Sequence, residues 1–175
     1  LVNTHTPEKI SKSGEKTWDD NNNQDGVRPA SITIRLHANG VEVAEKVVTA
    51  EDDWKWTFDN LDKYENGEKI TYTVTEDAVE DYTSVPNGMD VKNTHTPGET
   101  SITVTKAWED NSDQDGIRPD SVTVKLLANG EETGKTAELN EGNSWTYTFD
   151  KLDEYANGSK IEYTVEEVKT DVITD

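Results

Sequence analysis

The chain has 175 residues and a formal net charge of −20, from 17 Lys and Arg against 37 Asp and Glu. This acidity repels phosphate backbones and anionic lipids, so the composition argues against binding to nucleic acids or membrane surfaces. Cys is absent, which excludes disulfides, thiolate nucleophiles and Cys-based zinc sites, and a hydrophobic share of 31% leaves little material for a core.

The N-terminal residues are not expected to be a signal peptide, because no charged stretch is followed by an apolar one. No apolar run reaches the length of a membrane-spanning helix. The segment Asn3–Pro7 (NTHTP) recurs at Asn93–Pro97, an offset of 90. Residues 1–8 are therefore predicted to be the tail of a preceding repeat and its linker.

The whole chain contains two copies of one unit. Matching residues lie at an offset of 90 and, after one inserted residue, of 91: Lys16/Lys106, Trp18/Trp108, Asn39/Asn129, Trp54/Trp145 and Gly67/Gly158. The period exceeds the roughly 20–50 residues of solenoid repeats and fits small tandem domains. We predict a first repeat over 9–93, a linker over 94–100 and a second repeat over 101–175.

Short runs of alternating apolar and polar residues predict β-strands in each unit. In the first unit they lie at 32–36, 54–58 and 70–74, and their counterparts lie at 122–126, 145–149 and 161–165. Asn-Gly dipeptides at residues 39, 66, 87, 129 and 157 predict tight turns. No stretch has a helical apolar stripe, so the fold class is predicted to be all-β, with two tandem β-sandwiches.

Three polar residues of the first unit lie at positions whose alternation points into the core: Lys16, Glu76 and Asn93. Lys106 and Glu167 lie at the same positions of the second unit. Since an isolated buried charge is costly, the simplest interpretation is a buried Lys–Glu ion pair, hydrogen-bonded to the Asn. The second interpretation is a self-catalysed Lys–Asn amide, because burial favours the neutral amine and Glu can shuttle protons as ammonia leaves.

The second unit stops short of the segment that ends the first. Glu76 lies 17 residues before Asn93, whereas Glu167 lies 8 residues before the end of the sequence. We expect the second repeat, as given, to lack its last strand, and the chain to be an excerpt from a longer array.

The motifs of both units resemble the Cna B-type repeat, a stalk module of Gram-positive adhesins and pilins. The resemblance is carried by these runs: ITVTKAWED (102–110), QDGIRP (114–119), YTVEE (163–167) and, in the first unit, VKNTHTP (91–97). It implies a prealbumin-like, inverse-immunoglobulin β-sandwich with an intramolecular isopeptide bond. With the resemblance added, the covalent interpretation is favoured in the first unit.

The resemblance also implies roles for the inward polar residues. Lys16 is the nucleophile, Asn93 the acceptor and Glu76 the proton shuttle. The acceptor of the second unit is not in the sequence, and Asn3 is the acceptor of the unit before. The matching residues of the second unit are Lys106 and Glu167.

The function that the resemblance implies is that of a stalk or spacer in a secreted, cell-wall-anchored surface adhesin, a virulence factor. Bond formation is single-turnover, so the chain is not expected to be an enzyme, and no cofactor or metal is expected. The expected partners are neighbouring repeats of the array, with a host matrix protein bound through other domains. The chain is expected to be a monomer that binds neither nucleic acid nor membrane.

Two alternative functions stay open. The repeats could bind a ligand directly, which an exposed apolar patch outside the core alternation would support. Neighbouring molecules could also assemble head to tail by strand addition, with Lys106 accepting Asn3 of a neighbour.

Other polar motifs are predicted to be structural. The loops that begin at Asn21 and Asn111 start like calcium loops, but the Glu expected at position 12 is absent, so they are predicted to be Asx-rich turns. Acidic pairs such as Asp19-Asp20 are predicted to form a solvated surface. Arg28 and Arg118 are expected to anchor a loop to carboxylates that the sequence does not identify.

Overall fold

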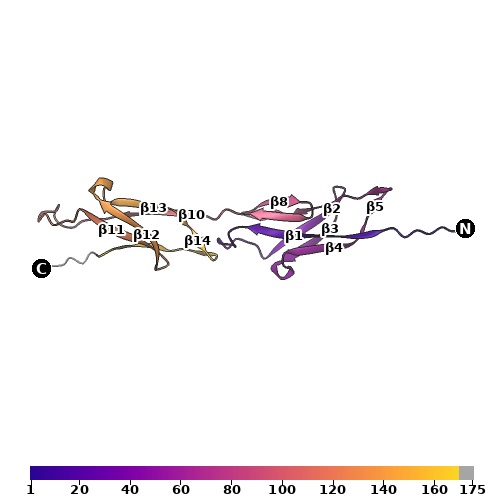
Figure 1. The fold of residues 1–175 in the computed structure, drawn as a ribbon, viewed down its shortest axis with the longest axis horizontal. Coiled ribbons are helices and arrows are strands. Elements are labelled where there is room, and N and C mark those ends of the chain that lie inside the picture. The colour runs from indigo at the N-terminus through magenta and orange to yellow at the C-terminus, as the bar shows by residue number, and fades with distance from the viewer. Residues whose placement is uncertain (170–175) are drawn as a thin grey trace. The chain divides into compact units, whose positions relative to one another are not determined.

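The computed structural model describes residues 1–169 and confirms the all-β fold class in two compact units (Figure 1). The first unit is Leu1–Thr96, and the second begins at Pro97. Among the described residues the only helical turns are two 3-10 turns, at Ala50–Asp52 and Glu141–Asn143. The end of the predicted second repeat, residues 170–175, lies outside the described residues.

The first unit has a four-stranded sheet, a three-stranded sheet and a short hairpin. Its strands are β1 (Lys9–Asp19), β2 (Ser31–Ala38), β3 (Val41–Thr49), β4 (Lys55–Asp62), β5 (Tyr64–Glu65), β6 (Glu68–Lys69), β7 (Tyr72–Glu76), β8 (Thr83–Asn87) and β9 (Asp90–Thr94). The strand orders are β4-β1-β9-β8 and β3-β2-β7, and β5 pairs with β6. The first and last strands therefore lie side by side, as indigo β1 and the pink hairpin do in Figure 1.

The strand β1 changes partner along its length. From Lys9 to Glu15 it pairs antiparallel with β4, and from Lys16 to Asp19 it pairs parallel with β9. The other strand pairs of the unit are antiparallel. Lys16 therefore lies at the point where β1 passes from its pairing with β4 to its pairing with β9.

The core of the first unit is packed by the alternation predicted from the sequence. Ile32, Ile34 and Leu36 of β2 are buried and face Trp56 and Phe58 of the other sheet. Burial of each such side chain contributes about 1.5–3 kcal/mol, so these rows hold the two sheets face to face.

The hairpin turns follow two backbone patterns. At Asn39-Gly40 and Asn66-Gly67 both residues have positive φ, as a type I′ turn requires. At the third predicted turn only Gly88 has positive φ, and Asn87 is still paired with Asp90 in the β8–β9 ladder. The turn itself is therefore Gly88-Met89.

The second unit repeats most of these elements. Its strands are β10 (Glu99–Thr105), β11 (Ser121–Ala128), β12 (Glu131–Asn140), β13 (Thr146–Asp153), β14 (Tyr155–Ala156), β15 (Ser159–Lys160) and β16 (Tyr163–Glu167). They form β12-β11-β16, β10-β13 and β14-β15. Within residues 97–169 no strand takes the place that β9 has beside β1, so β10 ends at Thr105, one residue before Lys106.

The two cores predict two separate unfolding transitions. Leu36→Ala empties part of the first core and should lower the free energy of unfolding of that unit by about 2–5 kcal/mol. Leu126→Ala should do the same to the second unit. Urea unfolding, followed through the Trp NMR signals of each unit, gives the free energy of unfolding of each unit separately. A single shared transition that shifts equally in both variants would contradict independent cores.

Candidate functional site

A buried ion pair crosses the core of the first unit. The Lys16 Nζ of β1 lies 2.5 Å from the Glu76 Oε1 of β7, on the opposite sheet, and both side chains are 0% exposed. Burial lowers the pKa of Lys16, although the hydrogen bond and charge of Glu76 act in the opposite direction. The pair therefore favours the neutral amine more than an exposed lysine does.

Asn93 completes the set of inward polar residues. It is fully buried on β9, and neither its Oδ1 nor its Nδ2 has a hydrogen-bond partner. In the parallel ladder Lys16 lies opposite Val91 and Trp18 opposite Asn93, so Lys16 and Asn93 are diagonal neighbours on one face. The second oxygen of Glu76 is also buried without a partner. A buried polar group without a partner costs about 1–3 kcal/mol, which makes this site unusual in a small core.

Aromatic rings separate the ion pair from water. The Lys16 Nζ lies 4.6 Å from the centroid of the Trp18 ring, a cation–π arrangement. Trp18 is in turn packed edge-on by Trp54 and Tyr82, at centroid distances of 5.2 and 5.0 Å. These rings keep the dielectric around the amine low.

A second buried cluster was missed by the sequence analysis, which predicted Asp20 to lie on a solvated surface. Asp20 is 1% exposed and accepts hydrogen bonds from Arg28, from the Tyr82 hydroxyl and from the backbone N–H of Asn23. Although burial opposes its ionisation, these donors lower its pKa to about 2. Asp20 is the partner of Arg28 that the sequence left unassigned, and its Asp-x₇-Arg spacing recurs as Asp110 and Arg118.

This cluster also organises the loop that resembled a calcium site. Asn21, Asn22 and Asn23 all have left-handed backbone conformations, and Asn23 accepts a hydrogen bond from the Arg28 backbone. The oxygens of Asp20 are occupied by protein donors. Among residues 1–169 no group of three or more His, Cys, Asp or Glu is arranged to hold a metal ion.

His95 joins the end of β9 to two loops. Its Nε2 lies 2.8 Å from Asp25 Oδ2, its Nδ1 lies 2.8 Å from the Asp81 carbonyl, and its ring packs against Tyr82. Two acceptors at the two ring nitrogens favour the doubly protonated imidazole. The hydrogen bond to Asp25 is the main cause of a raised His95 pKa, against partial burial.

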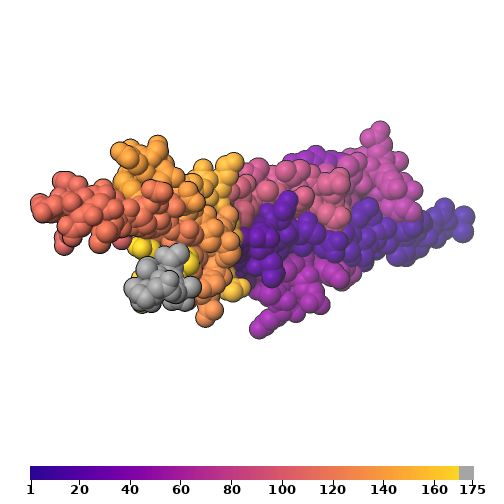
Figure 2. Space-filling model, turned by 60° about the vertical axis from the view of Figure 1, so that its left-hand side comes forward, coloured from indigo at the N-terminus to yellow at the C-terminus, as the bar shows by residue number. Residues whose placement is uncertain are grey.

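The second unit forms the same ion pair without burying it. The Lys106 Nζ lies 2.8 Å from Glu167 Oε2, but the side chains are 26% and 44% exposed. The expected core position of these residues is therefore not reached within residues 97–169, because no strand covers this edge. Asn3 is exposed and lies in the segment that precedes β1. This N-terminal segment is the indigo end of the chain in Figure 2.

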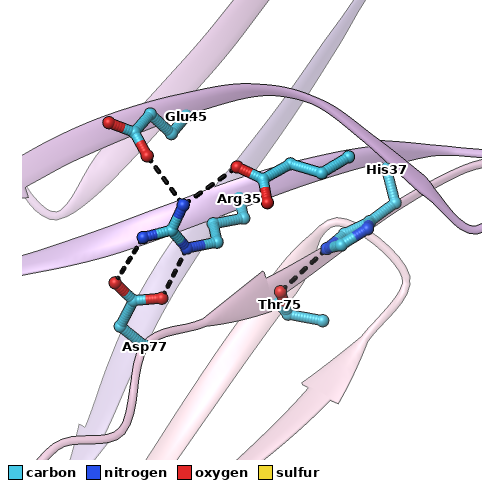
Figure 3. Close-up of polar contacts among 6 residues, drawn as sticks. Arg35, His37, Glu45, Thr75 and Asp77 are labelled. Atoms are coloured by element: carbon cyan, nitrogen blue, oxygen red, sulfur yellow. Dashed lines mark hydrogen bonds and ion pairs between the residues drawn. The ribbon is translucent and has the colours of Figure 1, made fainter.

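A third polar network lies on the outer face of the β3-β2-β7 sheet (Figure 3). Arg35 donates two hydrogen bonds to Asp77, at 2.6 and 2.8 Å, and one each to Glu42 and Glu45. These side chains are partly exposed, between 32% and 58%, and each such pair contributes little to stability. The network links the three strands and holds no group poised for chemistry.

The His95 contacts predict a pH-dependent stability of the first unit. Because the folded pKa is raised above the ordinary 6.5, the stabilisation is complete below pH 6.5 and is lost as the pH rises through the folded pKa. NMR titration of the ring should show this raised midpoint, and Asp25→Asn should lower it. Asp115→Asn, the counterpart in the second unit, is the control and should leave it unchanged; a midpoint insensitive to Asp25→Asn would contradict the pairing.

Three comparisons place the chain among known proteins. The model of the Cna protein B-type domain matches residues 12–94 and 102–174. The collagen adhesin of Staphylococcus aureus is 54% identical over 168 residues, which are 96% of this chain and 14% of that protein. The chain thus spans about one seventh of the length of that relative.

Two crystal structures from S. aureus are similar over nearly all of the chain. The single B repeat unit (B1) of the collagen-binding surface protein is 53% identical, with a TM-score of 0.50 over 93% of this chain and 87% of that chain. The two-repeat structure (B1B2) is also 53% identical, with a TM-score of 0.52 over 95% and 45%.

The matches agree with the expectation of a structural, non-enzymatic chain. These relatives are described as an adhesin and as repeat units of a surface protein, not as enzymes. No helix among residues 1–169 is long and apolar enough to span a membrane. The family model covers most of the chain in two copies, so the resemblance is confirmed: this chain belongs to the Cna protein B-type domain family.

Proposed function

We propose that the chain is a pair of stalk repeats from a cell-wall-anchored Gram-positive adhesin, and that the first repeat is locked by a Lys16–Asn93 isopeptide bond. The observation that carries the bond is the fully buried Lys16–Glu76 pair beside an Asn93 amide without a partner. The stalk role is supported by the similarity to B repeats of a collagen-binding surface protein.

The proposed reaction uses only these three side chains. The ammonium of Lys16 gives one proton to the Glu76 carboxylate, which leaves a neutral amine and a carboxylic acid. The amine Nζ attacks Cγ of Asn93 while the acid hydrogen-bonds to Oδ1 and then protonates Nδ2. The Nζ–Cγ bond forms and the Cγ–Nδ2 bond breaks. The attacking nitrogen gives its surplus proton to the Glu76 carboxylate, which passes it to the leaving ammonia. The balance is one amide made, one amide broken and one ammonium released, with Glu76 again ionised.

The bond would give this small domain a covalent closure. It links the first and last strands across a loop of 77 residues (93 − 16), for which the loop-entropy relation gives about 4.5 kcal/mol. That is a large share of the stability of a small domain. A pull on the two ends of the unit would load the covalent bond and not the hydrogen bonds between β1 and β9, as a mechanical tether requires. An amide also resists reduction, which a disulfide does not.

In the second unit we propose the same chemistry for Lys106 and Glu167 once a last strand covers them. Their contact and the position of Lys106 over the Trp108 ring repeat the arrangement of the first unit. Asn3 is proposed as the acceptor of the repeat that precedes residue 9. The acceptor for Lys106 comes from a segment that follows Glu167, or from Asn3 of another molecule in the head-to-tail alternative.

Direct adhesion by these repeats has weaker support. Val41, Val43 and Val47 are exposed on the edge strand β3 and lie outside the core alternation. Their counterparts in the second unit are polar: Glu131, Thr133 and Glu138. Because the repeats do not share this surface, we place binding of a host matrix protein in other regions of the adhesin.

The proposed bond predicts a mass deficit. Intact-mass measurement of the folded chain should find it lighter by one ammonia, and Lys16→Ala or Asn93→Ala should restore the full mass and lower the melting temperature of the first unit. Glu76→Gln should slow the loss strongly, because it removes the proton shuttle. Lys12→Ala and Lys106→Ala are matched controls that keep the deficit; a folded wild-type chain of full mass would refute the bond.

A further inference from the structure

The register of β9 on β1 decides whether Asn93 lies beside Lys16. We propose that Gly14 and Asp90 are positioning residues that seat the β8–β9 hairpin on β1 and thereby align Asn93 with Lys16. The inference rests on the proposed isopeptide bond, but the register can be measured without it.

Gly14 provides the space that the hairpin turn occupies. A Cβ at this position would lie 1.8 Å from the Met89 carbonyl oxygen, 2.7 Å from its carbon and 2.8 Å from Trp56 Nε1. The nearest two atoms belong to the backbone, so they cannot swing aside as a flexible side chain does. Gly14 is not among the positive-φ glycines, so the backbone conformation does not require a glycine. The contact with Met89 is what requires it.

Asp90 fixes the hairpin at the next residue of β1. The Glu15 backbone N–H donates to Asp90 Oδ1 at 3.0 Å. This hydrogen bond lies where β1 leaves β4, at the pair Glu15–Lys55, and joins β9, at the pair Lys16–Val91. It therefore sets the starting point of the parallel ladder.

The alignment of Asn93 depends on that starting point. A slip of one residue turns every side chain of a strand to the opposite face, which would move Asn93 out of the core. A slip of two residues would keep the face but replace Asn93 by Val91 or His95 beside Lys16. The ladder has four residue pairs, Lys16–Val91 to Asp19–Thr94, and its far end is held by the His95 N–H, which donates to the Asp19 carbonyl, and by Lys92, which lies 3.4 Å from Asp19 Oδ2. Gly14 and Asp90 lie at the other end of the ladder, where it starts at Lys16.

The second unit shows that the strand itself does not need a glycine. The counterpart of Gly14 is Val104, which pairs with Tyr147 of β13 as Gly14 pairs with Trp56 of β4. Val104 packs against the second core, where no hairpin turn approaches it within residues 97–169. The glycine is therefore needed where the β8–β9 turn lies against β1, and not for the pairing of this strand with β4.

The test measures the cross-linking rate and the strand register separately. After denaturation of freshly made, unreacted chain and refolding, ammonia loss from the first unit is followed by intact mass. Gly14→Ala, Gly14→Val and Asp90→Ala should each slow it by roughly tenfold or more. The Gly14 variants place a Cβ against the Met89 carbonyl, and Asp90→Ala removes the hydrogen bond from the Glu15 N–H. Asp90→Asn keeps the acceptor oxygen and should retain a rate near that of the wild type.

Matched controls are Ser13→Ala on β1 and Ser84→Ala on β8, both exposed, which should leave the rate unchanged. The register is read in a Lys16→Ala background, which cannot cross-link, by hydrogen exchange of the Val91–Thr94 amides and by nuclear Overhauser contacts between β1 and β9. Gly14→Ala and Asp90→Ala should lose this protection, while amides of β2 should keep theirs.

The outcomes separate the two proposals. If the wild-type chain never loses ammonia, the bond is refuted, but the hydrogen-exchange result still decides the positioning role. A Gly14→Val chain with wild-type rate and protection would overturn the role of Gly14. An Asp90→Asn chain as slow as Asp90→Ala would overturn the role of the Asp90 hydrogen bond. Gly14→Ala and Asp90→Ala add one methyl or no bulk, so they decide the question should Gly14→Val fail to fold.

Discussion

The first unit is organised around one buried ion pair, between Lys16 on one sheet and Glu76 on the other. A buried charge is tolerated only when it is paired, and removal of one partner of such a pair typically costs about 3–5 kcal/mol. The two strands that carry the pair must therefore keep their positions across the core. Asn93 lies on the strand next to Lys16, and both polar atoms of its buried side-chain amide lack a hydrogen-bond partner.

Aromatic rings and hydrogen bonds around the Lys16–Glu76 pair exclude water from it and connect β1 and β9 to the loop after β1. Trp18 lies against Lys16 and also against Arg28, which binds the buried Asp20, so the amine and the loop after β1 share one aromatic ring. His95 ties the end of β9 to the same loop region through Asp25. The second unit shows the consequence of leaving one side open: its Lys–Glu pair forms at a similar distance but remains partly exposed to solvent.

Much of this could be predicted from the alternation of residues along single strands. A period of two tells which side chains face inward, so the sequence predicts that Lys16, Glu76 and Asn93 lie in the core together with Ile34 and Leu36, and the structure buries these side chains. Four of the five Asn-Gly turns have the expected positive φ at both residues, because this dipeptide favours that conformation. At Asn87-Gly88 the pairing of Asn87 with Asp90 overrides the local preference. The period of about 90 residues likewise made the two-unit organisation visible without any structure.

The sequence by itself determined the fold class, the repeat and the facing of the polar residues, because each of these depends on neighbours along the chain. Only the tertiary structure decided which faces are covered: Asp20 is buried and Glu167 is half-exposed, although both belong to strongly acidic runs. Pairings such as Asp25 with His95 and Glu15 with Asp90 join residues 70 and 75 positions apart. Periodicity carries no information on such distances, since burial and register depend on which strand of the fold lies alongside.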